Sequence, residues 1–204
     1  MSDLTSEARA AAFRLLFETG EPVRPAALAD ELGCSVSEAT QAIAQLESQG
    51  LIRRDETGSI VGSYGLSVVP SQDVIHIQGR QLWTWCAKTS VGVLAALGGG
   101  TVESRCPMSG RQIRLTFEGP TPPKDTGLAV FWPGTELTSC CKSAVDEVCP
   151  NINFFESAEA AKSWAASSGV PGEVLSVEEA TARSVGKWAE LLEARKATSL
   201  SSQV

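Results

Sequence analysis

Histidine is nearly absent from this chain, because His76 is the single one among 204 residues. A Ser-His-Asp triad would have to use it, and a metal site built on several histidines is excluded. Residues 74–77 alternate as a short strand, which makes His76 a partly exposed strand residue in the simplest interpretation. Histidine-based hydrolases and histidine-rich metal sites are therefore disfavoured.

Long apolar runs are also missing, since none approaches the roughly 20 residues that span a bilayer. The first seven residues, MSDLTSE, have neither the basic nor the apolar region of a signal peptide. We therefore expect a soluble, cytoplasmic protein with no membrane partner. In a reducing cytosol, its six cysteines are more often metal-binding, catalytic or buried thiols than disulfides.

Basic residues are too few for general attraction to nucleic acid, with 17 Lys and Arg against 24 Asp and Glu. Three predicted helices followed by a predicted hairpin are typical of a winged helix-turn-helix: residues 5–19, 25–32 and 35–50, then strands 51–54 and 59–62. Yet residues 1–62 hold five arginines, no lysine and ten acidic residues. Phosphate binding depends on basic side chains. We expect a packing or dimerisation module, and nucleic acid is an improbable partner.

The pattern changes after residue 62 to short alternating strands, followed by helices. The predicted strands are residues 64–69, 74–77, 101–105, 112–117 and 128–132, and the predicted helices are residues 82–97, 158–168 and 177–197. This order indicates an α+β fold, in which a mixed or antiparallel sheet packs against helices. We predict two parts: a winged-helix-like module (1–62) and a catalytic domain (63–204).

No Cys-x-x-Cys occurs, so neither a zinc ribbon nor a thioredoxin motif is present. Cys34, in the corner after the second helix, and Cys106, at a strand end, are interpreted as structural. Cys140 and Cys141 are adjacent and could chelate a soft metal, although neighbouring side chains rarely point the same way.

Cys86 stands out because of its setting in LWTWCAKTS, residues 82–90. It is predicted in the first turns of a helix, whose dipole favours a thiolate. Thr89 is expected on the same helix face, and Trp83 and Trp85 can wall off a dry pocket. A cysteine buried in an aromatic core is an equally good interpretation of these features alone. Cys149 precedes Pro150 and a predicted buried strand, residues 152–155.

Three segments together resemble the organomercurial (alkylmercury) lyase family. SYGLSVVPSQDVIHIQGRQLWTWCA (63–87) is similar to the stretch that leads into the family's first catalytic cysteine. VCPNINFFES (148–157) is similar to the segment around the second. SRCPMSGRQIRLTF (104–117) resembles an intervening hairpin with a structural cysteine at the place of Cys106. The N-terminal winged helix is also a feature of that family.

The resemblance implies protonolysis of a carbon–mercury bond, with Cys86 as nucleophile and first metal ligand and Cys149 as second ligand. The implied partners are an organomercurial substrate, cellular thiols and mercuric reductase as product acceptor. No cofactor is implied, with Hg(II) bound as product. The family's third catalytic group is an aspartate three residues after the first cysteine, and Thr89 stands there. A threonine hydroxyl is not a general acid near neutral pH.

That departure keeps two alternatives open. A repurposed family member could bind a soft metal, or catalyse another thiol-dependent step, without cleaving alkylmercury. A winged-helix metal-responsive regulator is the third hypothesis, and the acidic third helix disfavours it.

Overall fold

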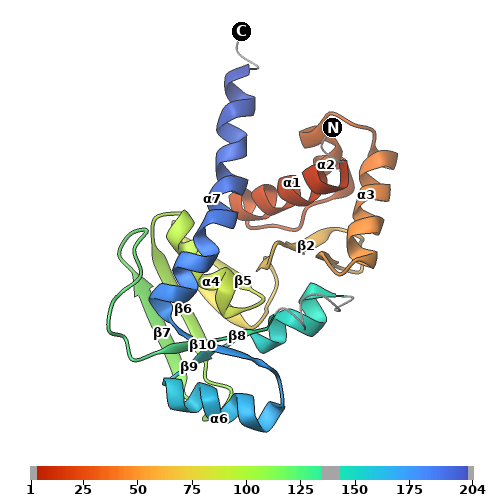
Figure 1. The fold of residues 1–204 in the computed structure, drawn as a ribbon. Helices are drawn as coiled ribbons and strands as arrows, with labels where there is room; N and C mark the ends of the chain where they lie inside the picture. The colour runs from red at the N-terminus through yellow and green to blue at the C-terminus, as the bar shows by residue number, and fades with distance from the viewer. Residues whose placement is uncertain (1–3, 135–142, 202–204) are drawn as a thin grey trace.

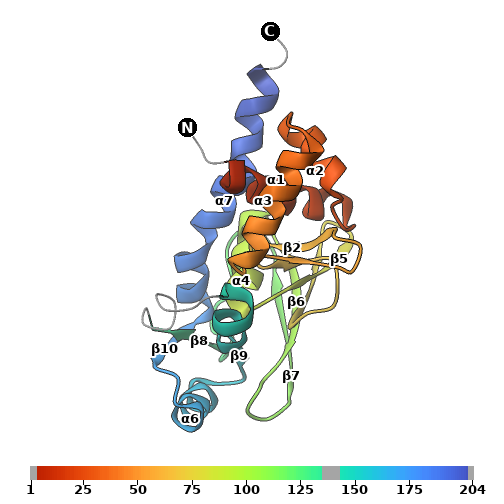
Figure 2. The ribbon, with the colours of Figure 1, turned by 90° about the vertical axis from the view of Figure 1, so that its right-hand side faces the viewer.

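The computed structural model describes residues 4–134 and 143–201, with side chains up to residue 191. It is an α+β fold of antiparallel sheets and helices, as predicted (Figures 1 and 2). The helices are α1 (Leu4–Thr19), α2 (Pro25–Leu32), α3 (Val36–Ser48), α4 (Ala87–Ala96), α6 (Ala158–Ser168) and α7 (Val177–Ser201), with short η1 (Ala144–Val148) and η2 (Cys149–Asn151). The strands are β1 (Ile52–Arg54), β2 (Ile60–Ser63), β3 (Leu66–Ser67), β4 (Asp73–Ile77), β5 (Arg80–Thr84), β6 (Gly100–Arg105), β7 (Gln112–Phe117), β8 (Ala129–Pro133), β9 (Phe154–Phe155) and β10 (Gly172–Ser176).

The N-terminal part contains three helices followed by the antiparallel pair β1–β2, in the predicted order. Ser35 and Glu38 form a reciprocal capping box at the start of α3, because the Ser35 side chain accepts from Glu38 N and Glu38 accepts from Ser35 N. Strand β2 then pairs with β3, so hydrogen bonds run across the proposed boundary at residue 62. The winged-helix assignment and that boundary remain predictions.

The main sheet has seven strands in the order β1-β2-β3-β5-β4-β6-β7, and every neighbouring pair is antiparallel. The predicted helix over residues 82–97 was wrong in its first part, since Arg80–Thr84 is strand β5 and α4 begins only at Ala87. Gln78 and Gly79 form the two-residue turn between β4 and β5, both with positive φ. Such a turn matches the twist of an antiparallel hairpin.

The predicted strand over residues 64–69 is also shorter than expected, because only Leu66–Ser67 pairs as β3. Tyr64 and Gly65 have φ of 49° and 88° and form a second tight turn, joining Ser63 to its partner Leu66. A tyrosine with positive φ is unusual. This turn directs Tyr64 away from the strand and into the pocket described below.

A smaller three-stranded sheet, β10-β8-β9, closes the fold, and α6 packs against it. Strand β10 was not predicted from the sequence. Helix α7 packs along α4, and beyond that contact it runs past α1 toward the C-terminus (Figure 1). Over the described part of the chain, no helix combines the length and apolar character needed to cross a bilayer. The cytoplasmic location remains a prediction.

Helices α4 and α7 approach closely at Gly92. A Cβ atom added there would lie 2.3 Å from the Trp188 ring, which is 2% exposed. Alanine is normally better than glycine in a helix by about 1 kcal/mol. At this site, however, the collision with a ring that cannot move outweighs that gain.

We therefore expect Gly92→Ala to lower the free energy of unfolding by about 1–3 kcal/mol, as overpacked cores do. Gly186→Ala is the matched control on α7, because nothing lies within 4 Å of its added Cβ. The control should raise stability by up to about 1 kcal/mol. Urea unfolding of both variants measures the difference. An unchanged or raised stability for Gly92→Ala would contradict the tight packing.

Candidate active site

Cys86 occupies the N-cap position of the ten-residue helix α4, with an extended backbone that continues from β5. The sequence predicted Cys86 inside the first turns of a helix that began at residue 82, but the helix begins only at Ala87, so Cys86 directly precedes it. The backbone N–H groups at the start of a helix have no intrahelical acceptors and carry partial positive charge. Cys86 is buried, at 2% exposure. The partial positive charge at the start of α4 favours the thiolate form of its side chain.

Cys149 lies at the junction of η1 and η2, and the segment that follows it docks against the start of α4. Ala87 N donates to Ile152 O at 3.0 Å. Gln72 Nε2, just before β4, donates to Asn153 Oδ1 at 2.7 Å. These contacts bring the two cysteines together although they are far apart in the sequence.

The two thiols line the same cavity, and their interaction shifts their pKa values in opposite directions. The hydrogen bond from Cys149 is the main cause of a lowered pKa at Cys86, with a smaller contribution from Thr89. The pKa of Cys149 is raised strongly by the same bond and by burial. Thr89 Oγ1 lies 3.5 Å from Cys86 Sγ and is 3% exposed. Of the two thiols, Cys86 is thus the one that loses its proton more readily.

The cysteine pocket is the cavity of about 110 Å³ that both thiols line. Its aromatic wall comes from Tyr64, Trp85 and Trp188, and its remaining lining residues are Arg9, Gly65, Lys88, Thr89, Ala144, Val148, Ile152 and Lys187. Trp83, predicted as a wall, is not a lining residue, since it lies on strand β5. Lys88, which follows Cys86 by two residues, also lines this pocket.

A buried carboxyl that sequence reasoning missed lies behind Cys86. Asp73 is fully buried at the start of β4 and accepts hydrogen bonds from Ser90 Oγ at 2.8 Å and Ser104 Oγ at 2.6 Å. Ser90 Oγ also lies 3.2 Å from the carbonyl oxygen of Cys86. Burial raises the pKa of Asp73 to about 6, although these hydrogen bonds oppose the shift. Its signal in the sequence was an acidic residue directly before the predicted strand 74–77.

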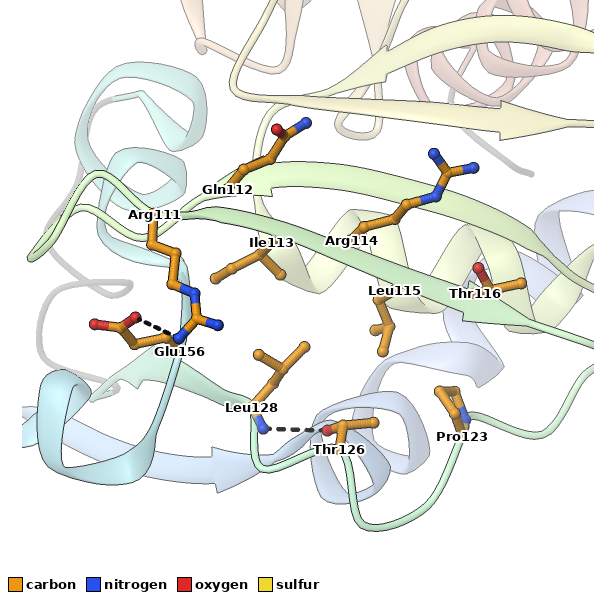
Figure 3. A pocket seen from close by; sticks show the side chains of 10 residues that line it. All are labelled: Arg111, Gln112, Ile113, Arg114, Leu115, Thr116, Pro123, Thr126, Leu128 and Glu156. Atoms are coloured by element: carbon orange, nitrogen blue, oxygen red, sulfur yellow. Dashed lines mark hydrogen bonds and ion pairs between the residues drawn. The ribbon is translucent and has the colours of Figure 1, made fainter.

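A larger hollow of about 570 Å³ lies along β7, away from the cysteines (Figure 3). Figure 3 shows Ile113 and Leu115 pointing toward Leu128 on one side of the strand, while Arg114 points to the other. Arg111 at its rim is paired with Glu156 at 3.4 Å. None of the four cysteines in the described part of the chain lines this hollow. The smaller cysteine pocket is therefore the better candidate for the functional site, because both reactive thiols line it.

The remaining cysteines are distributed elsewhere. Cys106 is fully buried in the hydrophobic core, and Cys34 is half-buried in the corner between α2 and α3. Cys140 and Cys141 lie outside the described residues. His76 is exposed on β4, as predicted, with Nε2 4.0 Å from a Glu103 oxygen. Across the two described ranges, no group of three or more Cys, His, Asp and Glu side chains is arranged to hold a metal ion.

The sequence profile of the alkylmercury lyase family matches residues 66–189, which include both pocket cysteines. The chain belongs to the alkylmercury lyase family. It is 35% identical over 152 residues to alkylmercury lyase from Staphylococcus epidermidis, covering 71% of this chain and 65% of that protein's length. It is 32% identical over 167 residues to alkylmercury lyase from Pseudomonas putida, covering 79% and 74%. The resemblance seen in the sequence is thus confirmed, and the family is one of enzymes.

The fold is shared with a solved member of this group. A crystal structure of the mercury-bound form of MerB2 matches with a TM-score of 0.76 at 23% identity, covering 91% of both chains. At that identity the likeness concerns the fold.

The buried Asp73 carboxyl should leave a signature in the pH dependence of stability. Its folded pKa of about 6 exceeds the ordinary 3.8, so the folded state holds the proton more tightly than the unfolded chain. The free energy of unfolding therefore falls as pH rises from about 4 to about 6, by about 3 kcal/mol from this group. Asp73→Asn should remove that component. Asp125→Asn, at an exposed position with positive φ that asparagine tolerates, should retain it.

Chemical denaturation at several pH values between 4 and 7 measures this slope. An unfolding free energy whose pH dependence is the same in Asp73→Asn and in the parent would show that Asp73 is ionised throughout.

Proposed function

We propose that this protein cleaves carbon–mercury bonds by protonolysis in the cysteine pocket. The observation that carries the proposal is that Cys86 and Cys149 line one small cavity, where the pKa of Cys86 is lowered and the pKa of Cys149 is raised. Two cysteines in one cavity suit a soft metal ion such as Hg(II), which prefers thiolate ligands. Membership of the alkylmercury lyase family supports the same reaction.

The proposed reaction begins with the Cys86 thiolate, which attacks mercury and displaces the carrier thiolate that was bound to it. Mercury is then bound to the Cys86 sulfur and to the carbon of the organic group. The Cys149 thiol gives its proton to that carbon as the carbon–mercury bond breaks, and the pair of electrons of the broken bond forms the new C–H bond. The products are a hydrocarbon and Hg(II) bound by both sulfurs, with no change in oxidation state.

Thr89 bears on where the proton comes from. Its hydroxyl lies 3.5 Å from Cys86 Sγ, so it can orient the thiolate, but it cannot act as a general acid near neutral pH. The raised pKa of Cys149 keeps a proton in the pocket next to the nucleophile. Cys149 is therefore our candidate proton donor, and Thr89 has a positioning role.

Release of the product requires thiols from outside, because two protein thiolates bind Hg(II) tightly. We propose that cellular thiols displace Cys149 and Cys86 in turn and that mercuric reductase is an acceptor of the metal. The proposed location is the cytoplasm, where reduced thiols are abundant.

Position 89 holds a threonine where the family resemblance implies an aspartate. This difference favours one competing function, a soft-metal binder that has the cysteine pair but does not cleave alkylmercury. A winged-helix regulator is less well supported, because α3 carries Glu38 and Glu47 and no basic residue. Arg54 on the hairpin is paired with Glu47, so it is not available to phosphates in this arrangement.

Replacing either pocket cysteine tests the proposal directly. Cys86→Ser and Cys149→Ser should each lower turnover by at least about a thousandfold, since an alcohol is a poor nucleophile and a poor ligand for a soft metal. The release of benzene from phenylmercury in excess thiol measures turnover. Cys34→Ser is the matched control, because Cys34 lies outside the pocket, and it should retain parental turnover. Turnover that survives in Cys86→Ser rules out this mechanism.

Position 89 separates the lyase from the metal binder. Thr89→Asp puts a titratable carboxyl of similar volume beside Cys86, and in a lyase it should raise turnover by about tenfold or more through general acid catalysis. Thr89→Asn, which has no titratable proton, is the control and should give no gain. If wild type and Thr89→Asp bind Hg(II) equally well but neither releases hydrocarbon, the protein is a soft-metal binder.

A further inference from the structure

Three cationic side chains line the cysteine pocket, although the whole chain has a net charge of −7. Arg9 comes from α1, Lys88 from α4 and Lys187 from α7. Among the described residues that line this pocket, none is acidic. We call these three residues the cation cluster. Positive charge is thus gathered from three separate helices at the place where the proposed chemistry occurs.

Aromatic rings hold the cation cluster in place. The Arg9 guanidinium lies 3.9 Å from the centre of the Tyr64 ring, and Lys187 Nζ lies 5.1 Å from the same ring. Lys88 Nζ lies 4.8 Å from the centre of the Trp132 ring. A ring face attracts a cation but carries no net negative charge. The rings therefore fix these side chains without neutralising them.

No ion pair is formed by any of the three within the described residues, where other arginines pair with carboxylates. Arg9 Nε is buried without a hydrogen-bond partner, and so is Trp188 Nε1 at the same pocket. Partial burial of the Lys187 ammonium group, followed by repulsion from Arg9 and Lys88, lowers the pKa of Lys187 to about 8. The residue as a whole remains exposed. The pocket thus offers unmatched hydrogen-bond donors and an uncompensated positive field.

A Cys86 thiolate would offset part of this positive charge, but its charge is lost during the proposed reaction. Once Cys86 has bound mercury, its charge is neutralised, and the product with two sulfurs on Hg(II) is also neutral. Three cations then remain together, and no carboxylate is present among the lining residues within ranges 4–134 and 143–191. An anion brought by the ligand would restore the balance at this stage.

We propose that the cation cluster binds a carboxylate carried into the pocket with the mercury atom, so that the protein prefers negatively charged mercury compounds to neutral ones. This inference rests on the proposed function and names its substrate class. The carboxylate has two possible sources, the organic group on mercury or the thiol that carries the mercurial. Both present the same chemistry to Arg9, Lys88 and Lys187.

The test compares two arylmercury compounds of the same skeleton, 4-carboxyphenylmercury and phenylmercury. Each is supplied with a neutral thiol, 2-mercaptoethanol, and separately with an anionic thiol, 3-mercaptopropionate. In wild type, kcat/KM should be higher for the charged combination by about threefold or more, the size of one partly exposed charge pair. A preference that follows the aryl carboxylate assigns the anion to the substrate, and one that follows the thiol assigns it to the carrier.

The variants are Lys187→Met, which keeps the stem and removes the charge, and Lys187→Arg, which keeps the charge. Lys187→Met should abolish the preference and Lys187→Arg should preserve it. Lys162→Met is the matched control, an exposed lysine on α6 outside the pocket. It should leave the preference unchanged. If Lys187→Met instead slows charged and neutral substrates equally, the cations act on the thiolates alone and the inference is wrong.

A second measurement does not depend on turnover. Iodoacetate and iodoacetamide alkylate thiolates by the same displacement of iodide, and only the first is anionic. The rate ratio of iodoacetate to iodoacetamide at the pocket cysteines should fall by about threefold or more in Lys187→Met relative to wild type. If wild type releases no hydrocarbon from either mercurial, the lyase proposal fails. An unchanged alkylation ratio would overturn the anion site itself.

Discussion

The backbone hydrogen bond from Ala87 to Ile152 is the contact on which the arrangement of the site depends. It joins the first turn of α4, which follows Cys86, to the segment that follows Cys149. Gln72 reinforces the same junction through Asn153. Because both cysteines flank this junction, their separation is set by the main chain and not by the choice of side-chain rotamers alone. Such preorganisation is what a two-sulfur metal site requires.

Beneath that junction the chain also holds a second, fully buried acid. Asp73 is linked through Ser90 to the carbonyl oxygen of Cys86 and through Ser104 to strand β6. Its negative form disfavours the Cys86 thiolate, because the charge of Asp73 raises the pKa of that thiol. The hydrogen bond from Cys149 outweighs this effect. The protonation state of Cys86 therefore depends on two opposing effects, one from Cys149 in the pocket and one from the Asp73 carboxyl behind it.

The sequence predicted the α+β class, most strands and helices, and the two cysteine segments, because hydrophobic periodicity and motif similarity are local properties. It failed where a turn decided the outcome. Gln78-Gly79 and Tyr64-Gly65 both adopt positive φ and form hairpin turns. As a result, residues predicted as the start of a helix form strand β5, and β3 is shorter than predicted. The cation cluster was not predicted, since Arg9, Lys88 and Lys187 meet only through the packing of α1, α4 and α7. Side-chain neighbours of that kind are set by tertiary structure.

The aromatic wall of the cysteine pocket has an optical consequence. Two of the five tryptophans, Trp85 and Trp188, line the cavity together with both thiols. Both rings are almost completely buried, at 4% and 2% exposure, so their emission arises from an apolar environment. Mercury is a heavy atom that quenches nearby indole fluorescence. Two intrinsic fluorophores therefore line the same cavity as the cysteine pair, so the proposed binding and release of mercury would change the emission of the unlabelled protein.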